Sequence, residues 1–217
     1  MTNSQESELE HLPEVRFEDL PDELQASCRR NGWESLLPVQ AKSIPYIRDG
    51  RDLMVQSRTG SGKTGAFLLP ILERMDPNER VSQALVLVPT RELARQVIDD
   101  AEALCHGTGI RSVALYGGVG YGPQLEALEA GVSLVVGTPG RILDHLMRGT
   151  LVLDDLKILV FDEADRMLSM GFYPDMRELA RYLPKDRDGF MFSATYPPSV
   201  LSLAGQFLDN PEFMSLS

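Results

Sequence analysis

Six short apolar runs, separated by longer helix-forming stretches, constrain the fold more than any other feature of this sequence. Continuous runs of Val, Leu and Ile are typical of strands buried on both faces, and the intervening stretches, such as Glu92–Cys105, have helical periodicity. This alternation predicts an α/β fold with a mostly parallel sheet and helices on both faces. Ligands then bind beyond the carboxyl ends of the strands, so functional residues are expected just after each run. The runs are Leu53–Val55, Ala84–Val88, Val113–Leu115, Leu134–Val136, Ile158–Phe161 and Phe190–Phe192.

The composition is that of a soluble globular protein, with 43% hydrophobic and 24% charged residues among 217. No apolar run reaches the roughly 18 residues of a membrane span, and the polar, acidic start of the chain is unlike a signal peptide. Cys28 and Cys105, the only cysteines, form neither a CxxC pair nor a zinc spacing. A cytoplasmic location in a reducing compartment is therefore expected.

The acidic charge is concentrated at the amino end. The formal net charge is −11, and residues 1–23 hold eight acidic residues against a single base, Arg16. The global charge therefore neither supports nor excludes a local phosphate-binding surface. We expect residues 1–14 to be a disordered, acidic lead-in and residues 15–217 to form one domain.

The first apolar run leads into a glycine-rich segment that is typical of a phosphate-binding loop. A strand, a glycine-rich turn and a helix start place backbone N–H groups and the helix dipole toward phosphates. Lys63 is then expected to reach the β and γ phosphates and Thr64 to bind Mg²⁺. The strict pattern has glycine where this chain has Ser57, and the alternative interpretation is a flexible loop without function. The expected nucleotide-binding residues are Ser57, Arg58, Thr59, Gly60, Ser61, Gly62, Lys63 and Thr64.

The fifth apolar run ends in the acidic segment Asp162-Glu163-Ala164-Asp165. A carboxylate at the tip of a buried strand is costly unless it is compensated, and Mg²⁺ is a natural partner. Asp162 is therefore expected to bind the metal, and Glu163 to orient and deprotonate the attacking water. A solvated turn or helix cap is the alternative. With Lys63 and Thr64, the segment predicts a P-loop NTPase that binds a nucleotide with Mg²⁺, and no more than that. The resemblance described next implies that this nucleotide is ATP or ADP.

The acidic segment and five further segments resemble, in the same order, those of the DEAD-box RNA helicases. The five are Phe17 with Gly32–Gln40, then Pro89–Ala94, Gly117-Gly118, Thr138–Arg141 and Ser193–Thr195. The resemblance covers about residues 15–217 and implies the amino-terminal, RecA-like, ATP-binding domain of such a helicase.

The first of these segments resembles the adenine-reading Q motif. In that reading Gln40 pairs with the N6 and N7 atoms of adenine, which selects ATP over GTP, and Phe17 stacks on the base. The family usually has Pro-Thr where this chain has Leu36-Leu37. Without the resemblance, the alternatives are that Gln40 is a helix-surface residue and Phe17 a core residue.

Three segments that follow apolar runs line an RNA groove in the family. Such contacts follow the backbone and are independent of base sequence; taken singly, each segment is also typical of a turn with a helix cap. By resemblance, Asp165, Ser193 and Thr195 couple the nucleotide site to RNA through hydrogen bonds, where the alternative is an ordinary strand-end turn. The expected RNA-binding residues are Pro89, Thr90, Arg91, Gly117, Gly118, Thr138, Pro139, Gly140 and Arg141.

In the family a second RecA-like domain follows and brings an arginine-rich segment, which this chain lacks. We therefore expect the chain, probed alone, to be a monomer that binds adenine nucleotide and hydrolyses ATP poorly. The whole protein is expected to unwind RNA locally. Two alternatives remain open: an RNA clamp or scaffold gated by nucleotide, and an unrelated P-loop ATPase such as a transporter subunit, which would carry an LSGGQ-like signature that is absent here.

Overall fold

The computed structural model describes residues 11–216, and within this range seven strands form one sheet in the order β3-β4-β2-β5-β6-β1-β7. Every pair of neighbouring strands is parallel. Each of the six predicted runs is a strand whose ends lie within two residues of the prediction. The fold class is thereby confirmed. The strands are β1 Leu53–Gln56, β2 Ala84–Leu87, β3 Ser112–Leu115, β4 Leu134–Gly137, β5 Ile158–Asp162, β6 Asp188–Ser193 and β7 Glu212–Ser215.

The seventh strand, β7, was not predicted from the sequence. It pairs with β1 alone and forms one edge of the sheet. Its side chains are half buried or exposed, and Phe213 keeps 46% of its surface exposed. A short edge strand needs no apolar run, because only one side of it is paired and neither face is fully covered.

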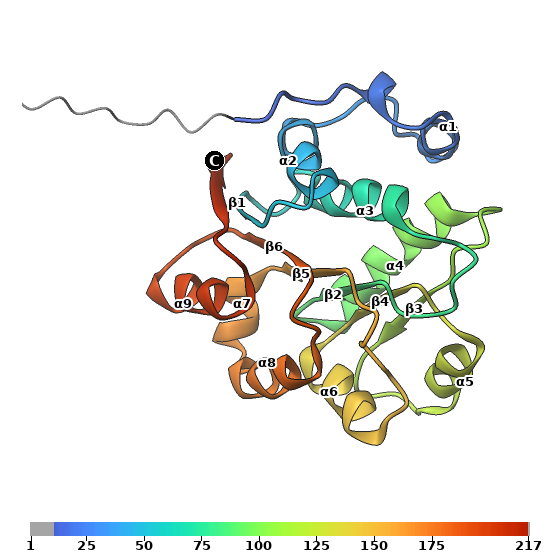
Figure 1. Ribbon diagram of the computed structural model, residues 1–217, viewed down its shortest axis with the longest axis vertical. Helices are drawn as coiled ribbons and strands as arrows, with labels where there is room; N and C mark the ends of the chain where they lie inside the picture. The colour runs from blue at the N-terminus through green and yellow to red at the C-terminus, as the bar shows by residue number, and fades with distance from the viewer. Residues whose placement is uncertain (1–10, 217) are drawn as a thin grey trace, which may run out of the picture.

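Helices cover both faces of the sheet (Figure 1). α2, α3 and α4 lie on one face, with α1 beyond them, and α6 to α9 lie on the other face, with α5 beside β3. The helices are α1 Asp22–Arg30, α2 Pro38–Arg48, α3 Lys63–Arg74, α4 Arg91–Cys105, α5 Gly122–Ala130, α6 Pro139–Arg148, α7 Ala164–Ser169, α8 Tyr173–Leu179 and α9 Pro198–Phe207, with short 3₁₀ turns η1 at Phe17–Asp19 and η2 at Ala180–Tyr182.

Alternate residues of the central strands feed two separate cores. Val160 and Phe192 belong to the core under α2, α3 and α4, whereas Leu159 and Met191 belong to the core under α6 to α9. This follows from the two-residue period of a strand. Burial of each such side chain contributes about 1.5–3 kcal/mol, so the strands are fixed from both sides.

The expected lead-in begins outside the described structure, since residues 1–10 are not described. Residues 11–14 of the expected lead-in are described and contact the rest of the domain, while the expected disorder stays a prediction. The backbone amide of Leu12 donates to the Tyr46 hydroxyl at 3.1 Å, and Leu12 packs against the core. Among the described helices, none combines the length and hydropathy needed to cross a membrane.

Candidate functional site

The sheet register brings the ends of six strands into one row. Gln56 is opposite Ser193, Asp162 is opposite Phe192, and Leu87 is opposite Phe161. The strand order divides this row into two halves. The segments expected to bind nucleotide and metal follow β1 and β5, the expected coupling residues Ser193 and Thr195 lie at the end of β6, and the segments expected to bind RNA follow β2, β3 and β4. The two candidate sites are thus neighbours on one edge of the sheet.

The phosphate loop lies between β1 and α3. Gly60 and Gly62 adopt positive φ angles of +80° and +86°, a region that favours glycine. Gly62 is the N-cap of α3, and no side chain caps the helix there. Free backbone N–H groups at a helix start form an anion site. The loop therefore has the geometry of a phosphate cradle.

Lys63 joins the loop to the acidic segment. Its Nζ lies 3.1 Å from Asp162 Oδ1 and 3.4 Å from Glu163 Oε1. Asp162 has no exposed surface, and burial raises the pKa of its carboxyl group while the Lys63 ammonium opposes that rise. The three predicted catalytic residues therefore lie together.

The side chains around this ion pair suit a hard cation and phosphate oxygens. Neither Asp162 oxygen accepts a hydrogen bond of good geometry, and the buried hydroxyls of Ser57 and Ser61 have no partner. Buried polar atoms are normally satisfied. Carboxylate and hydroxyl oxygens are the ligands that Mg²⁺ prefers, so these residues fit a nucleotide with its metal.

The backbone at Glu163 is held in an unusual conformation. Its φ of +56° lies in the left-handed region, which costs energy for a residue other than glycine. This conformation forms the turn from β5 into α7. The Glu163 carboxylate also accepts a hydrogen bond from Arg166 Nη1 at 3.3 Å. Such strain is typical of functional turns.

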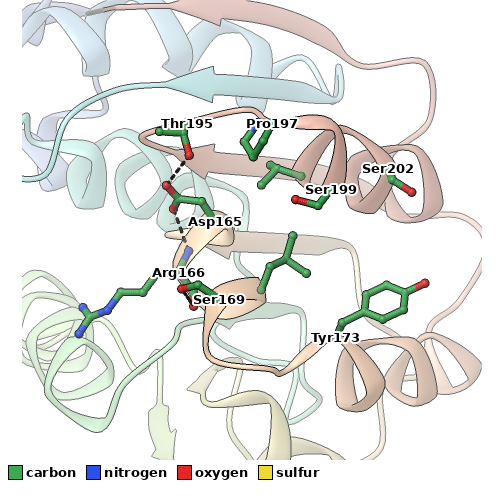
Figure 2. Close-up of a pocket in the computed structure, with 10 residues that line it drawn as sticks. Asp165, Arg166, Ser169, Tyr173, Thr195, Pro197, Ser199 and Ser202 are labelled. Atoms are coloured by element: carbon green, nitrogen blue, oxygen red, sulfur yellow. Dashed lines mark hydrogen bonds between the residues drawn. The ribbon is translucent and has the colours of Figure 1, made fainter.

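The expected hydrogen bonds between the acidic segment and the end of β6 are present. Asp165 N donates to Ser193 Oγ at 3.1 Å, and Thr195 Oγ1 donates to Asp165 Oδ2 at 2.8 Å. Figure 2 shows this second bond at the rim of a pocket between α7, α8 and α9. The contact is therefore established, while a coupling role for it remains a prediction.

Gln40 touches the phosphate loop from α2. Its Nε2 donates to the Gly62 carbonyl at 3.0 Å, and its Oε1 accepts from the Leu37 amide at 2.9 Å. The fit is close, since a Cβ added at Gly65 would lie 2.4 Å from Gln40 Nε2. Gln40 is 6% exposed, so it is not a helix-surface residue.

Phe17 is placed differently from the expectation. It is 5% exposed and belongs to the core, with the Arg29 guanidinium 5.1 Å from its ring centroid. Stacking needs an open ring face. In this conformation Phe17 is a core residue, and stacking on a base requires Arg29 or another neighbour to move.

The expected RNA segments lie together, but two of their members are buried. Pro139 is the first residue of α6, Pro89 lies two residues before α4, and both prolines are buried. Direct contact of these two prolines with RNA stays a prediction, and their burial leaves little side-chain surface for it. Proline is favoured at a helix start because its missing N–H has no partner there in any case. Thr90 is also a cap, since its hydroxyl accepts from Leu93 N at 3.2 Å.

The remaining residues of these segments reach the surface. Arg91 lies with its guanidinium 5.0 Å from the Tyr116 ring centroid, and Gly117 and Gly118 are exposed with open space around them. Arg141 is half buried and donates to the Val119 carbonyl at 3.1 Å. Thr138 and Gly140 are half buried beside it.

Sequence reasoning missed two buried polar residues behind this surface, Gln124 and His145. They are 5% and 0% exposed and lie 2.8 Å apart, between Oε1 and Nε2. A lone glutamine on a polar helix and a lone histidine carry no motif. The pair can be recognised only once the sheet order is known, because that order makes the segments after β3 and β4 neighbours.

Comparisons with known proteins agree with this arrangement. A family model described as DEAD/DEAH box helicase matches residues 37–203. The structure is similar to that of a DEAD box protein from the hyperthermophile Methanococcus jannaschii, with a TM-score of 0.89, 39% identity, and coverage of 94% of this chain and 57% of that one. The chain belongs to the DEAD/DEAH box helicase family, which confirms the resemblance.

Curated relatives point the same way. The chain is 44% identical over 201 residues to the ATP-dependent RNA helicase DeaD of Haemophilus influenzae, covering 91% of this chain and 33% of the relative. It is 48% identical over 185 residues to DeaD of Escherichia coli K12, covering 83% and 29%. The chain thus spans about a third of the length of these relatives.

Proposed function

We propose that this chain is the ATP-binding half of the catalytic core of an ATP-dependent RNA helicase that remodels RNA locally. The position of Lys63 carries the proposal. Lys63 is the first residue of α3, directly after the phosphate loop. Its Nζ lies within 3.4 Å of a carboxylate oxygen of Asp162 and of Glu163. A lysine shared by a phosphate loop and an acidic strand end is the minimum arrangement for phosphoryl transfer. The names of the relatives supply the substrate class, RNA.

The residues of the site have separate roles in this proposal. Backbone amides of residues 57–62 bind the phosphates, and Lys63 turns from the carboxylates to the γ-phosphate when nucleotide enters. Thr64 and Asp162 hold Mg²⁺, which when bound neutralises charge on the β and γ phosphates. Glu163 orients a water and accepts its proton.

Gln40 keeps the capacity to read adenine. An amide oxygen has two lone pairs and an amide nitrogen two hydrogens. Leu37 and Gly62 use one of each. One acceptor and one donor remain, which is the pair that adenine N6 and N7 require. Guanine presents the acceptor O6 where adenine presents the N6 donor, so it cannot donate to the amide oxygen and ATP is preferred over GTP.

The RNA surface and the second domain complete the proposed protein. Thr90, Arg91, the Gly117-Gly118 turn, Gly140 and Arg141 contact the RNA backbone without reading its sequence. A second RecA-like domain supplies the arginines that stabilise the transition state, a contribution of about 10³–10⁵ in related enzymes. The chain alone therefore acts as a monomer with low turnover. The proposed location is cytoplasmic, and the buried free thiols of Cys28 and Cys105 support it.

Calorimetry with ADP and GDP in Mg²⁺ tests the nucleotide site. We expect ADP to bind, GDP to bind at least about tenfold more weakly, and Gln40→Ala to erase the difference, because one lost bidentate pair is worth about 1–3 kcal/mol. Gln96→Ala, on the exposed face of α4, is the matched control and should keep the preference. Equal binding of ADP and GDP by the unmodified chain contradicts adenine reading.

Turnover and strand displacement test the enzyme proposal against a nucleotide-gated clamp. The whole protein is expected to hydrolyse ATP with RNA stimulation and to open a short duplex, and Glu163→Gln should abolish both while retaining ATP binding. A protein that holds RNA with ATP but never displaces a strand is a clamp. Brisk, RNA-stimulated turnover by residues 1–217 alone contradicts the role given to the second domain.

A further inference from the structure

Gln124 is the buried residue of α5, with 5% of its surface exposed. A buried amide is stable where its polar atoms are satisfied. Its Nε2 donates to the Tyr116 carbonyl at 3.1 Å, and its Oε1 accepts from Arg141 Nη1 at 3.2 Å. This one side chain therefore connects the end of β3 with the first turn of α6, which are two parts of the proposed RNA surface.

His145 completes the connection from inside α6. Its Nε2 lies 2.8 Å from Gln124 Oε1, and its Nδ1 lies 2.8 Å from Thr150 Oγ1. The Gln124 nitrogen faces the Tyr116 carbonyl, so the amide oxygen faces His145, and an amide oxygen only accepts. Nε2 therefore donates to the Gln124 oxygen, while Nδ1 lies beside the Thr150 hydroxyl, which also lies 3.1 Å from the His145 carbonyl.

The consequence is a fixed orientation for Arg141. Gln124 holds its Nη1, the Val119 carbonyl accepts from its Nη2 at 3.1 Å, and the guanidinium carbon lies 4.0 Å from the Tyr121 ring centroid. These contacts tie Arg141 to the loop of residues 117–122. A guanidinium has five N–H groups. The Arg141 guanidinium is therefore held in place and still has N–H groups that can donate to a phosphate.

We propose that Gln124 and His145 are positioning residues that hold Arg141 and the Gly117-Gly118 turn in the geometry needed for contact with the RNA backbone. The inference rests on the proposed RNA-binding function. Both side chains are buried, so they act through Arg141 and the Tyr116 carbonyl rather than on RNA. The network lies on the β3-β4-β2 half of the strand row, away from the phosphate loop after β1.

Paired measurements of RNA and ADP affinity test the proposal. The probes are a fluorescein-labelled single-stranded uridine oligomer, followed by anisotropy at low salt, and ADP, followed by calorimetry. Gln124→Met keeps the side-chain volume but removes the polar atoms. We expect it to raise the Kd for RNA about tenfold, as for loss of a buried hydrogen-bond partner, and to leave the Kd for ADP within about twofold.

A matched pair at His145 separates positioning from packing. His145→Gln places an amide nitrogen near the Nε2 position and should keep RNA affinity within about twofold, whereas His145→Asn is too short to reach Gln124 and should weaken it about tenfold. The pair also decides the question if Gln124→Met fails to fold. Equal RNA affinity of the two His145 variants, or parallel loss of ADP affinity, overturns the proposal. If the unmodified chain binds ADP but no RNA, the proposed RNA function fails and this inference fails with it.

Discussion

The Thr195 hydroxyl donates to the Asp165 carboxylate at 2.8 Å, while the backbone amide of the same Asp165 donates to the fully buried Ser193 hydroxyl at 3.1 Å. Two hydrogen bonds, one of them more deeply buried than the other, thus join the end of β6 to the acidic segment. We expect Ser193→Ala to destabilise the chain by about 1–3 kcal/mol, because it leaves the half-buried Asp165 amide without its partner. Thr195→Val, at an exposed position, should cost less than about 1 kcal/mol. Urea unfolding measures both, and equal effects contradict the difference in depth.

Removal of the Lys63 side chain should separate stability from binding. Lys63→Met leaves the fully buried Asp162 without its cation, and loss of one partner of a buried pair costs about 3–5 kcal/mol. Adding Asp162→Asn removes the uncompensated charge and should restore most of the unfolding free energy. Neither variant should bind ADP detectably by calorimetry. A double variant no more stable than Lys63→Met refutes this account.

Two helical glycines should respond in opposite directions to alanine. A Cβ at Gly65 would lie 2.4 Å from Gln40 Nε2 and 3.2 Å from Trp33. We expect Gly65→Ala to destabilise by about 1–3 kcal/mol through overpacking and to reduce the preference for ADP over GDP. Gly205, in α9, has open space around its Cβ position, so Gly205→Ala should stabilise by about 0.5–1 kcal/mol. Thermal unfolding of both variants checks the signs.

His145 should make stability depend on pH below neutrality. Burial lowers the pKa of His145 below its usual 6.5, and the Arg141 guanidinium acts in the same direction while Asp144 opposes it. The folded state therefore favours the neutral ring. The stability contributed by this preference is complete above pH 6.5 and is lost as the pH falls toward the folded pKa. Urea unfolding at decreasing pH should show a steeper loss for the unmodified chain than for His145→Gln. Parallel curves contradict the assignment.

The sequence predicted the strands that are buried on both faces, because such strands need continuous apolar residues such as Val160 and Phe161. It also predicted that Lys63 and Asp162 lie together, because both belong to local motifs that follow buried strands. The sequence did not predict β7, because an edge strand is half exposed and needs no continuous apolar run.

Residues whose role depends on packing between segments could not be predicted. Phe17 has its ring covered by Arg29, a contact that no local pattern encodes. Pro89 and Pro139 shape helix starts from beneath the surface. Gln124 and His145 become meaningful only once α5 and α6 are placed side by side.

Because all the strands run in one direction, the predicted site residues lie at one edge of the sheet, and the turns at the other edge only connect helices to strands. All predicted site residues after the strands gather at the carboxyl edge, so the turns at the opposite edge carry none of them. The exposed tips at residues 107–109 and 185–186 are examples. Loop tips of this kind accept added segments readily. The fold can therefore be extended, tagged or joined to other modules at the edge formed by the amino ends of the strands. The carboxyl edge, which carries the predicted site residues, is then left intact.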